Sequence, residues 1–184
     1  MRRIRYGVGM SLNGFIADRD GDTGFLVSDA SYDPGPFFAS IDTVIMGRLT
    51  YSAAVRLGMR AYPGLRTYVV SRTLAPADYP EVTILRDAAD LAELRRTAGK
   101  DIWLCGGGVL LASVLRADLV DTIELGVSPM LSGHPGIPML AADPGLPSAV
   151  PLELTHHRAL PSGLLVLEYA VRKSDIRQGS LNAG

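Results

Sequence analysis

The sequence predicts an α/β fold, a three-layer sandwich on a mixed, mostly parallel sheet with antiparallel strands at its C-terminal edge. Two observations predict it. Strand-like and helix-like segments alternate from residue 5 to residue 119, and three strand-like segments without intervening helices follow. A length of 184 residues with 47% hydrophobic and 20% charged residues fits one compact domain. We expect this domain to span residues 1–173 and the polar residues 174–184 to form a flexible tail.

The alternating part opens with a strand at Arg5–Leu12, which ends where Asn13-Gly14 permits a turn. The segment Asp18–Pro36 is rich in Asp, Gly and Pro and predicts a long loop, of a length often used for lids or substrate walls. The helix expected at Asp87–Ala98 carries leucines on one face and charges on the other. Other strands, marked by β-branched and apolar residues, are expected at Thr43–Met46, Thr67–Ser71, Glu81–Leu85 and Asp101–Cys105, and other helices at Phe37–Ile41, from Leu49, and at Val109–Leu119.

The C-terminal part has a different pattern, with strands expected at Thr122–Val127, Leu152–His157 and Leu164–Val171 and a loop at Pro129–Pro151. Consecutive strands without helical crossovers pair antiparallel, so we expect a reversed strand at the edge of the sheet. His156 and His157 are adjacent on one of these strands and point to opposite faces. We therefore expect no metal site.

Charge and cysteine content exclude several classes of partner. The formal net charge is −1, which provides no overall field for nucleic acid or for an anionic membrane surface. No apolar run is long enough to cross a bilayer, and the basic start of the chain fits a first strand better than a signal peptide. Cys105 is the only cysteine, so an intrachain disulfide is excluded, which fits a reducing compartment. We expect a cytoplasmic protein that acts on a small molecule.

Two strand ends carry groups suited to phosphate. At the first, Gly47 lets the backbone approach a ligand, Arg48 supplies a cation, and Thr50 can cap a helix or donate to a phosphate oxygen. The alternative is an ordinary strand-to-helix turn with a surface arginine. At the second, Ser71 and Arg72 offer a hydroxyl and a planar guanidinium, which suit the 2′-phosphate that separates NADPH from NADH. The alternative is a solvated strand end.

A third junction consists of consecutive glycines. Gly106, Gly107 and Gly108 stand between a strand and a helix, where bare amides and the positive end of the helix dipole can face a pyrophosphate. Their spacing differs from the G-x-G-x-x-G fingerprint, and a purely steric turn is the alternative. Cys105, just before them, fits a small buried residue better than a nucleophile.

Taken together, these segments resemble the dihydrofolate reductase superfamily, and within it the branch that includes the reductase domain of riboflavin biosynthesis. The segments that carry the resemblance are Met10–Ala17 (MSLNGFIA), Asp42–Tyr51 (DTVIMGRLTY), Gly106–Gly108, Ala117–Asp121 and Val127–Gly133. The resemblance covers roughly Arg5–Arg172, and the segments in this order are far more specific than any one of them.

The resemblance implies an NADPH-dependent reductase that passes hydride to a small heterocyclic (pteridine- or pyrimidine-like) or carbonyl substrate. It assigns the pyrophosphate to Gly47, Arg48, Thr50, Gly106, Gly107 and Gly108, the 2′-phosphate to Ser71 and Arg72, and the nicotinamide carboxamide to the backbone of Gly9, Ile16 and Ala17. It also implies a homodimer formed through the C-terminal strands.

The same resemblance leads to candidate catalytic and substrate residues. The parent family carries a carboxylate before the strand that ends in Met-Gly-Arg, and Asp33 is our candidate proton donor there, with a helix cap as the alternative. Asn13 stands where the branch carries an aspartate, and with Asp18 it is a candidate substrate contact. The tryptophan–proline signature of true dihydrofolate reductases is missing, so we expect a substrate other than dihydrofolate.

Two other functions stay open at this point. One is the riboflavin-pathway reductase, which acts on a ribosylamino-pyrimidine. Its phosphorylated substrate needs a second cationic site, for which Arg56, Arg60 and Arg66 are available. The other is a non-catalytic NADPH-binding sensor or assembly protein.

Overall fold

The computed structural model describes residues 1–133, 135–142, 145–146 and 148–173. Its strands are β1 (Ile4–Ser11), β2 (Phe15–Ala17), β3 (Ile41–Gly47), β4 (Arg66–Val70), β5 (Thr83–Leu85), β6 (Asp101–Leu104), β7 (Thr122–Ser128), β8 (Ile137–Pro138), β9 (Leu152–Ala159) and β10 (Leu165–Val171). Its helices are α1 (Gly35–Ser40), α2 (Arg48–Arg56), α3 (Asp90–Leu94) and α4 (Gly108–Arg116), with a 3₁₀ turn at Pro76–Asp78. The tail expected at residues 174–184 lies outside the described residues.

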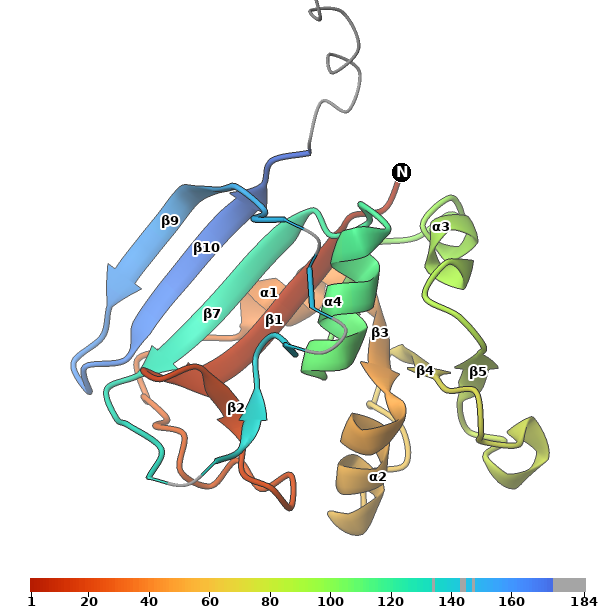
Figure 1. Ribbon diagram of the computed structural model, residues 1–184, viewed down its shortest axis with the longest axis horizontal. Coiled ribbons are helices and arrows are strands. Elements are labelled where there is room, and N and C mark those ends of the chain that lie inside the picture. The colour runs from red at the N-terminus through yellow and green to blue at the C-terminus, as the bar shows by residue number, and fades with distance from the viewer. Residues whose placement is uncertain (134, 143–144, 147, 174–184) are drawn as a thin grey trace, which may run out of the picture.

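Eight strands form one sheet in the order β5-β4-β3-β6-β1-β7-β10-β9, and β2 pairs with β8 in a small second sheet. The neighbours from β5 to β7 run parallel, whereas β10 runs antiparallel to both β7 and β9. Figure 1 shows α4 in front of this sheet and α1 behind it. The predicted α/β class with a mostly parallel sheet and antiparallel C-terminal strands is confirmed.

The position of the reversed strand differs from our expectation. We expected it at the edge, but β10 lies between β7 and β9, and β9 forms the edge. The physical reason is burial. Leu167, Tyr169 and Val171 of β10 pack against the core, whereas every residue of β9 is exposed, so the more apolar strand takes the inner place. The short connection from β9 to β10 makes them a hairpin.

Three local expectations need correction. Strands β2 and β8 were not predicted, and β8 lies inside the stretch expected to be a loop. Both are so short that no hydrophobic period shows them in the sequence. The third helix is also shorter than the expected Asp87–Ala98, because hydrogen bonds between residues three apart replace the helical pattern at both of its ends.

Apolar side chains fill both faces of the sheet. Tyr6 of β1 and Leu111 of α4 are fully buried between the sheet and α4. On the side of α2, Val44 of β3 packs with the buried Tyr51. Among the described residues, no helix is long and apolar enough to span a bilayer.

Candidate functional site

The three junctions expected to bind phosphate lie side by side at one edge of the sheet. Strands β4, β3 and β6 are parallel neighbours, so their carboxyl ends meet at the same edge. Gly47 pairs with Val70 in the register of β3 and β4, and the Cys105 amide donates to the Ile45 carbonyl at 2.8 Å. We call this side, with Gly47, Arg72 and the glycines after β6, the carboxyl edge.

The glycine junction and the start of α2 face each other across a short gap. Gly106 and Gly107 have φ angles of +71° and +86°, a backbone conformation that favours glycine. A Cβ at Gly107 would lie 3.4 Å from Thr50 Oγ1, and one at Gly106 would lie 3.9 Å from Ile16 Cδ1. Gly107 itself is the N-cap of α4, and no side chain in the described part of the chain caps that helix, so its first amides stay open to a ligand.

Thr50 does not cap a helix, as we had considered. The N-cap of α2 is Gly47, and no side chain of a described residue caps this helix either. Thr50 has no hydrogen bond to another described residue, and its hydroxyl faces the glycine junction. The hydroxyl is therefore available to a ligand.

A cleft of about 650 Å³ opens at this place. It is lined by Gly9, Ile16, Ala17, Thr50 and Gly106, all of which the sequence analysis had assigned to cofactor binding. We call it the carboxyl-edge cleft. Segments far apart in the chain thus converge on one hollow of a size that suits a nucleotide.

Two arginines at the carboxyl edge have no partner within the described part of the chain. Arg48 and Arg72 are exposed, and neither forms a hydrogen bond or an ion pair with another described residue. Both follow the ends of parallel strands, β3 and β4. They leave two guanidinium groups free to bind an anion.

The remaining two predicted phosphate residues have structural duties. Ser71 is buried, and its hydroxyl accepts hydrogen bonds from the amides of Thr73 at 3.2 Å and Leu74 at 3.1 Å. A Cβ at Gly108 would come within 2.5 Å of the Pro138 carbonyl oxygen, so the main chain of the 138–141 segment occupies this approach. Ser71 therefore shapes the turn that presents Arg72, and Gly108 permits close backbone packing.

Arg86 is a residue of this edge that the sequence analysis missed. It follows β5 directly, and its guanidinium donates to the carbonyls of Ser71 at 3.0 Å and Leu74 at 2.8 Å. It thereby holds the turn that carries Arg72. The available signal was its place at a strand end, the same signal that had marked Arg72.

A second cavity, of about 500 Å³, adjoins the carboxyl-edge cleft and shares Gly9, Leu26 and Trp103 with it. We call it the inner pocket. Its floor is the sheet itself, at the point where Gly9 of β1 pairs with Gly126 of β7, and the side chains of Leu26 and Leu164 lie over these two glycines. Phe37 and Trp103 form an edge-to-face pair on one wall, with ring centroids 5.6 Å apart.

The glycines of this floor were not expected from the sequence. Gly7 and Gly9 alternate on one face of β1, which was the only available signal. Gly9 lies next to Gly126 only because β1 pairs with β7, which is about 120 residues away in sequence.

Neither candidate substrate contact lies in these cavities. Asn13 is exposed. Its side-chain oxygen accepts a hydrogen bond from the Ser132 amide at 2.9 Å, and its side-chain nitrogen donates one to the Ser132 carbonyl at 3.1 Å. The Asp18 carboxylate accepts the amides of Asp20 at 2.9 Å and Asp22 at 2.8 Å. Both side chains stabilise turns.

Asp33, the candidate proton donor, lies farther out. It is exposed, and its carboxylate accepts the Gly35 amide at 2.8 Å at the start of α1. It lines a third, polar hollow of about 300 Å³ together with His156 and Arg158, which we call the outer hollow. The cleft, the inner pocket and the outer hollow follow one another across the sheet, since Gly7, Gly9 and Trp103 line the first two and Phe37 the last two.

The only cysteine is a neutral thiol at physiological pH. Burial raises the pKa of the Cys105 thiol to about 11, and its Sγ lies 3.7 Å from the Tyr62 hydroxyl. A nucleophilic role needs a lowered pKa. The structure therefore gives Cys105 a packing role at the end of β6.

The sequence profile of the RibD C-terminal domain family matches residues 2–166. A Bacillus subtilis (strain 168) protein, YwjB, is 32% identical over 140 residues, which cover 72% of this chain and 79% of YwjB. A putative riboflavin biosynthesis protein from Shewanella sp. PV-4 superposes with a TM-score of 0.74 at 24% identity, over 94% of this chain and all of that one. A dihydrofolate reductase from Enterococcus faecalis, solved with NADP(H), superposes with a TM-score of 0.65 at 14% identity, over 93% of this chain and 97% of that one. The chain belongs to the RibD C-terminal domain family and shares the fold of dihydrofolate reductase.

Proposed function

We propose that this protein is an NADPH-dependent reductase that transfers hydride to a small heterocyclic or carbonyl substrate. One observation carries the proposal. Open helix amides at a glycine junction, two unpaired arginines and a nucleotide-sized cleft meet at one edge of the sheet, beside a second pocket. The family and the fold of an NADP(H)-bound reductase support the same conclusion.

The residues present fit a phosphorylated dinucleotide. The amides that follow Gly107, with Arg48 and the Thr50 hydroxyl, would hold the pyrophosphate in a space that a side chain would fill. Arg72, on the turn held by Arg86, would hold the 2′-phosphate. When bound, the cofactor supplies the hydride.

The chain itself orients the reactants and excludes water. Gly9 lines both the cleft and the inner pocket, and Ile16 lines the cleft, so a nicotinamide ring held near Gly9 would lie against the substrate. Leu26 and Trp103 line both cavities and present apolar surface at their junction. From the outer hollow, Asp33 can deliver a proton only through solvent.

The site favours this function over the riboflavin-pathway reaction. Of the three arginines considered for a substrate phosphate, Arg60 is paired with Glu81 at 3.4 Å and Arg66 with Asp42 at 2.9 Å. Arg56 lies at the carboxyl-edge cleft and donates to the backbone of Asp20. None of the three lines the inner pocket.

A homodimer through the C-terminal strands is part of the proposal. Strand β9 is an unpaired edge in which all eight residues are exposed, and Leu152 and Leu154 are 41% and 49% exposed. A long edge strand with apolar side chains is a ready surface for a second copy. In sedimentation experiments we expect a dimer that Leu154→Glu converts to monomer. A wild-type monomer would contradict this assignment.

The proposed reaction is tested by turnover. The purified protein is mixed with NADPH and a panel of pterins, pyrimidines, quinones and carbonyl compounds, and loss of the reduced nicotinamide absorbance is followed. We expect oxidation with at least one heterocycle or carbonyl compound. Binding of NADPH without oxidation by any compound would instead favour the sensor or assembly function.

A further inference from the structure

The carboxyl-edge cleft has charged residues of its own, apart from the free arginines that follow β3 and β4. Among the described residues, its charged lining consists of Arg19, Asp20 and Arg56, whereas Arg48 and Arg72 do not line it. A phosphate group that lies inside the cleft therefore needs a cation other than these last two. The candidates are Arg19 and Arg56.

Arg19 is free to bind a ligand. It follows β2 closely, is exposed, and forms no hydrogen bond or ion pair with another described residue. A guanidinium group without an internal partner can bind an anion without giving up a contact inside the protein. Removing its side chain also breaks no contact of the described chain, so the variant is a clean test.

The turn that carries Arg19 is built by the protein itself. The Asp18 carboxylate accepts the amides of Asp20 at 2.9 Å and Asp22 at 2.8 Å, and the Gly21 amide donates to the Asp18 carbonyl at 3.2 Å. The backbone at Arg19 is thus fixed before any ligand arrives. Only the side chain then loses conformational freedom on binding, which lowers the entropic cost.

This turn is also anchored on α2. The Arg56 guanidinium donates to the Asp20 carbonyl, and a Cβ at Gly21 would lie 3.1 Å from the Ala53 Cβ. The same helix carries Thr50, whose hydroxyl faces the glycine junction and lines the same cleft. The turn after β2 and the start of α2 therefore present a guanidinium group and a hydroxyl to one cavity.

The charge of the cleft favours an anion close to the nicotinamide end. The guanidinium groups of Arg19 and Arg56 outnumber the single carboxylate of Asp20. Ile16 and Ala17, proposed to contact the nicotinamide carboxamide, belong to β2 and stand only two and three residues before Arg19. Of the two phosphates in the pyrophosphate, the one nearer the nicotinamide is therefore within the part of the cleft that Arg19 lines.

We propose that Arg19 binds the nicotinamide-side phosphate of the dinucleotide. This rests on the proposed reductase function, because it takes the cleft as the cofactor site. Arginines on two separate elements then hold the two halves of the cofactor, Arg19 the nicotinamide half and Arg72 the adenosine half. Arg19 sets the affinity for NADPH and NADH alike, whereas Arg72 distinguishes between them.

Fragments of the cofactor separate these two roles. Isothermal titration calorimetry measures the binding of NADPH, NADH, reduced nicotinamide mononucleotide and adenosine 2′,5′-bisphosphate. The proteins are wild type, Arg19→Ala, Arg72→Ala and Arg96→Ala. Arg96 is the matched control, because its side chain is 64% exposed, its only described partner is Glu93, and it does not line the cleft.

We expect Arg19→Ala to bind NADPH, NADH and the reduced mononucleotide about tenfold more weakly, as for the loss of a charge-assisted hydrogen bond, and the bisphosphate as tightly as wild type. Arg72→Ala should weaken the bisphosphate and leave the mononucleotide unchanged. Arg96→Ala should behave as wild type. Unchanged NADPH affinity in Arg19→Ala, equal losses for the two fragments in that variant, or no binding of the mononucleotide by wild type would overturn the proposal.

The same titrations tell the failure of this proposal from the failure of the reductase proposal. If wild type and Arg19→Ala bind NADPH equally, the assignment of Arg19 fails and the reductase proposal stands. If wild type binds the reduced mononucleotide through Arg19 but does not bind NADPH, the NADPH-dependent reductase proposal fails and the phosphate site at Arg19 stands.

Discussion

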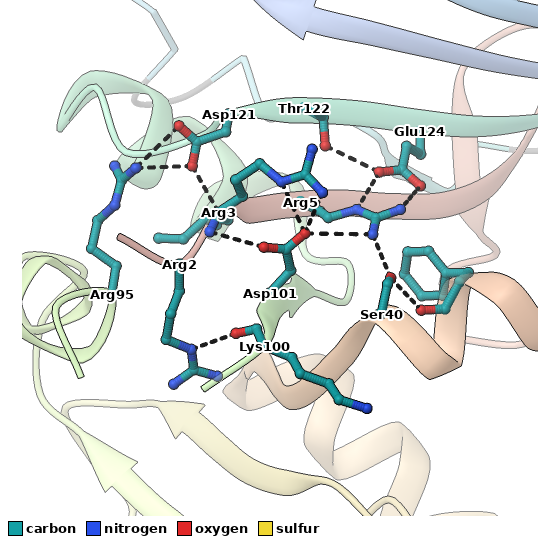
Figure 2. Close-up of polar contacts among 12 residues, drawn as sticks. Arg2, Arg3, Arg5, Ser40, Arg95, Lys100, Asp101, Asp121, Thr122 and Glu124 are labelled. Atoms are coloured by element: carbon teal, nitrogen blue, oxygen red, sulfur yellow. Dashed lines mark hydrogen bonds and ion pairs between the residues drawn. The ribbon is translucent and has the colours of Figure 1, made fainter. Parts of the chain in front are cut away.

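The two ends of the central sheet use arginine in opposite ways. At the amino edge, where β1, β4, β6 and β7 begin, Arg2, Arg3, Arg5, Arg66 and Arg95 each bind a carboxylate. Figure 2 shows part of this network, with Arg95 on Asp121, Arg3 on Asp101 and Arg5 on Glu124. At the carboxyl edge, Arg56 and Arg86 bind only main-chain carbonyls, and Arg48 and Arg72 bind no other residue of the described chain.

This difference separates residues that stabilise the fold from residues that can bind a ligand. A charge paired inside the protein contributes to folding, and removing one partner leaves the other uncompensated. An unpaired, solvated charge contributes almost nothing to folding. The carboxyl edge therefore keeps cations and bare amides for a partner from outside. We therefore expect a graded series of effects, from a large loss of stability at a buried, paired arginine to almost none at an unpaired one.

The largest loss is expected at Arg2. Its guanidinium is buried and binds Asp42, Thr43 and the Lys100 carbonyl. Arg2→Met should lower the free energy of unfolding by about 3–5 kcal/mol, because it leaves buried acceptors unsatisfied. The measurement is urea denaturation.

The control for Arg2 is Arg3→Met at the same edge. The Arg3 side chain is 58% exposed although it pairs with Asp101 at 2.6 Å, so its loss should cost no more than about 1 kcal/mol. Equal losses for the two variants would show that burial does not distinguish these arginines.

The next largest effect is expected at the glycine junction. Gly107→Ala forces a side chain into a φ of +86° and should cost about 1–2 kcal/mol. Its methyl group would also lie 3.4 Å from Thr50 Oγ1, in the proposed phosphate space, so NADPH should bind at least about tenfold more weakly.

Gly58→Ala is the matched control for this variant. Gly58 has a φ of +82° and no atom within 4 Å of its Cβ position, so the same strain arises away from the cleft. We expect a similar loss of stability in the denaturation curve and unchanged NADPH affinity. Weaker NADPH binding in Gly58→Ala would mean that backbone strain alone explains the effect at Gly107.

The amino edge should also lose stability in acid. Burial alone would raise the pKa of Asp42, but hydrogen bonds from Thr43, the Lys100 amide and Arg66 outweigh it and lower the pKa overall. A carboxyl whose folded pKa lies below its unfolded value of about 3.9 stabilises the fold above that pH and loses this contribution as the pH falls through the folded pKa. Unfolding free energies below about pH 4 should therefore decline. Asp42→Asn should show a shallower decline, and an identical decline would remove Asp42 from this role.

The parts of the site that could be predicted are those formed by residues adjacent in the sequence. Gly106-Gly107 and Met46-Gly47-Arg48 mark strand ends locally, and parallel strands bring such ends to one edge, so the cleft could be expected. Ser71 and Gly108 follow the same sequence pattern, but the structure uses them for packing. The Ser71 hydroxyl binds the main chain of its own turn, and Gly108 packs closely against the main chain at Pro138.

The inner pocket could not be expected, because its parts meet only through tertiary structure. Gly9 and Gly126 face each other by the register of two strands far apart in sequence. Glu168 lines the inner pocket only because its strand, β10, lies beside β7, an order of strands that we had not predicted. Without that order its carboxylate would lie at an exposed edge rather than in a pocket.

The smallest change in stability, and the most direct test of the account, is expected at Arg72. Arg72→Ala should leave the free energy of unfolding within about 0.5 kcal/mol of wild type, since the side chain is exposed and unpaired. The dissociation constants of NADPH and NADH for both proteins, measured through Trp103 fluorescence, then test the division between the two edges. The account predicts that NADPH loses about 1.5–3 kcal/mol of binding free energy while NADH is unchanged. Equal losses for the two cofactors, or no loss for NADPH, would contradict it.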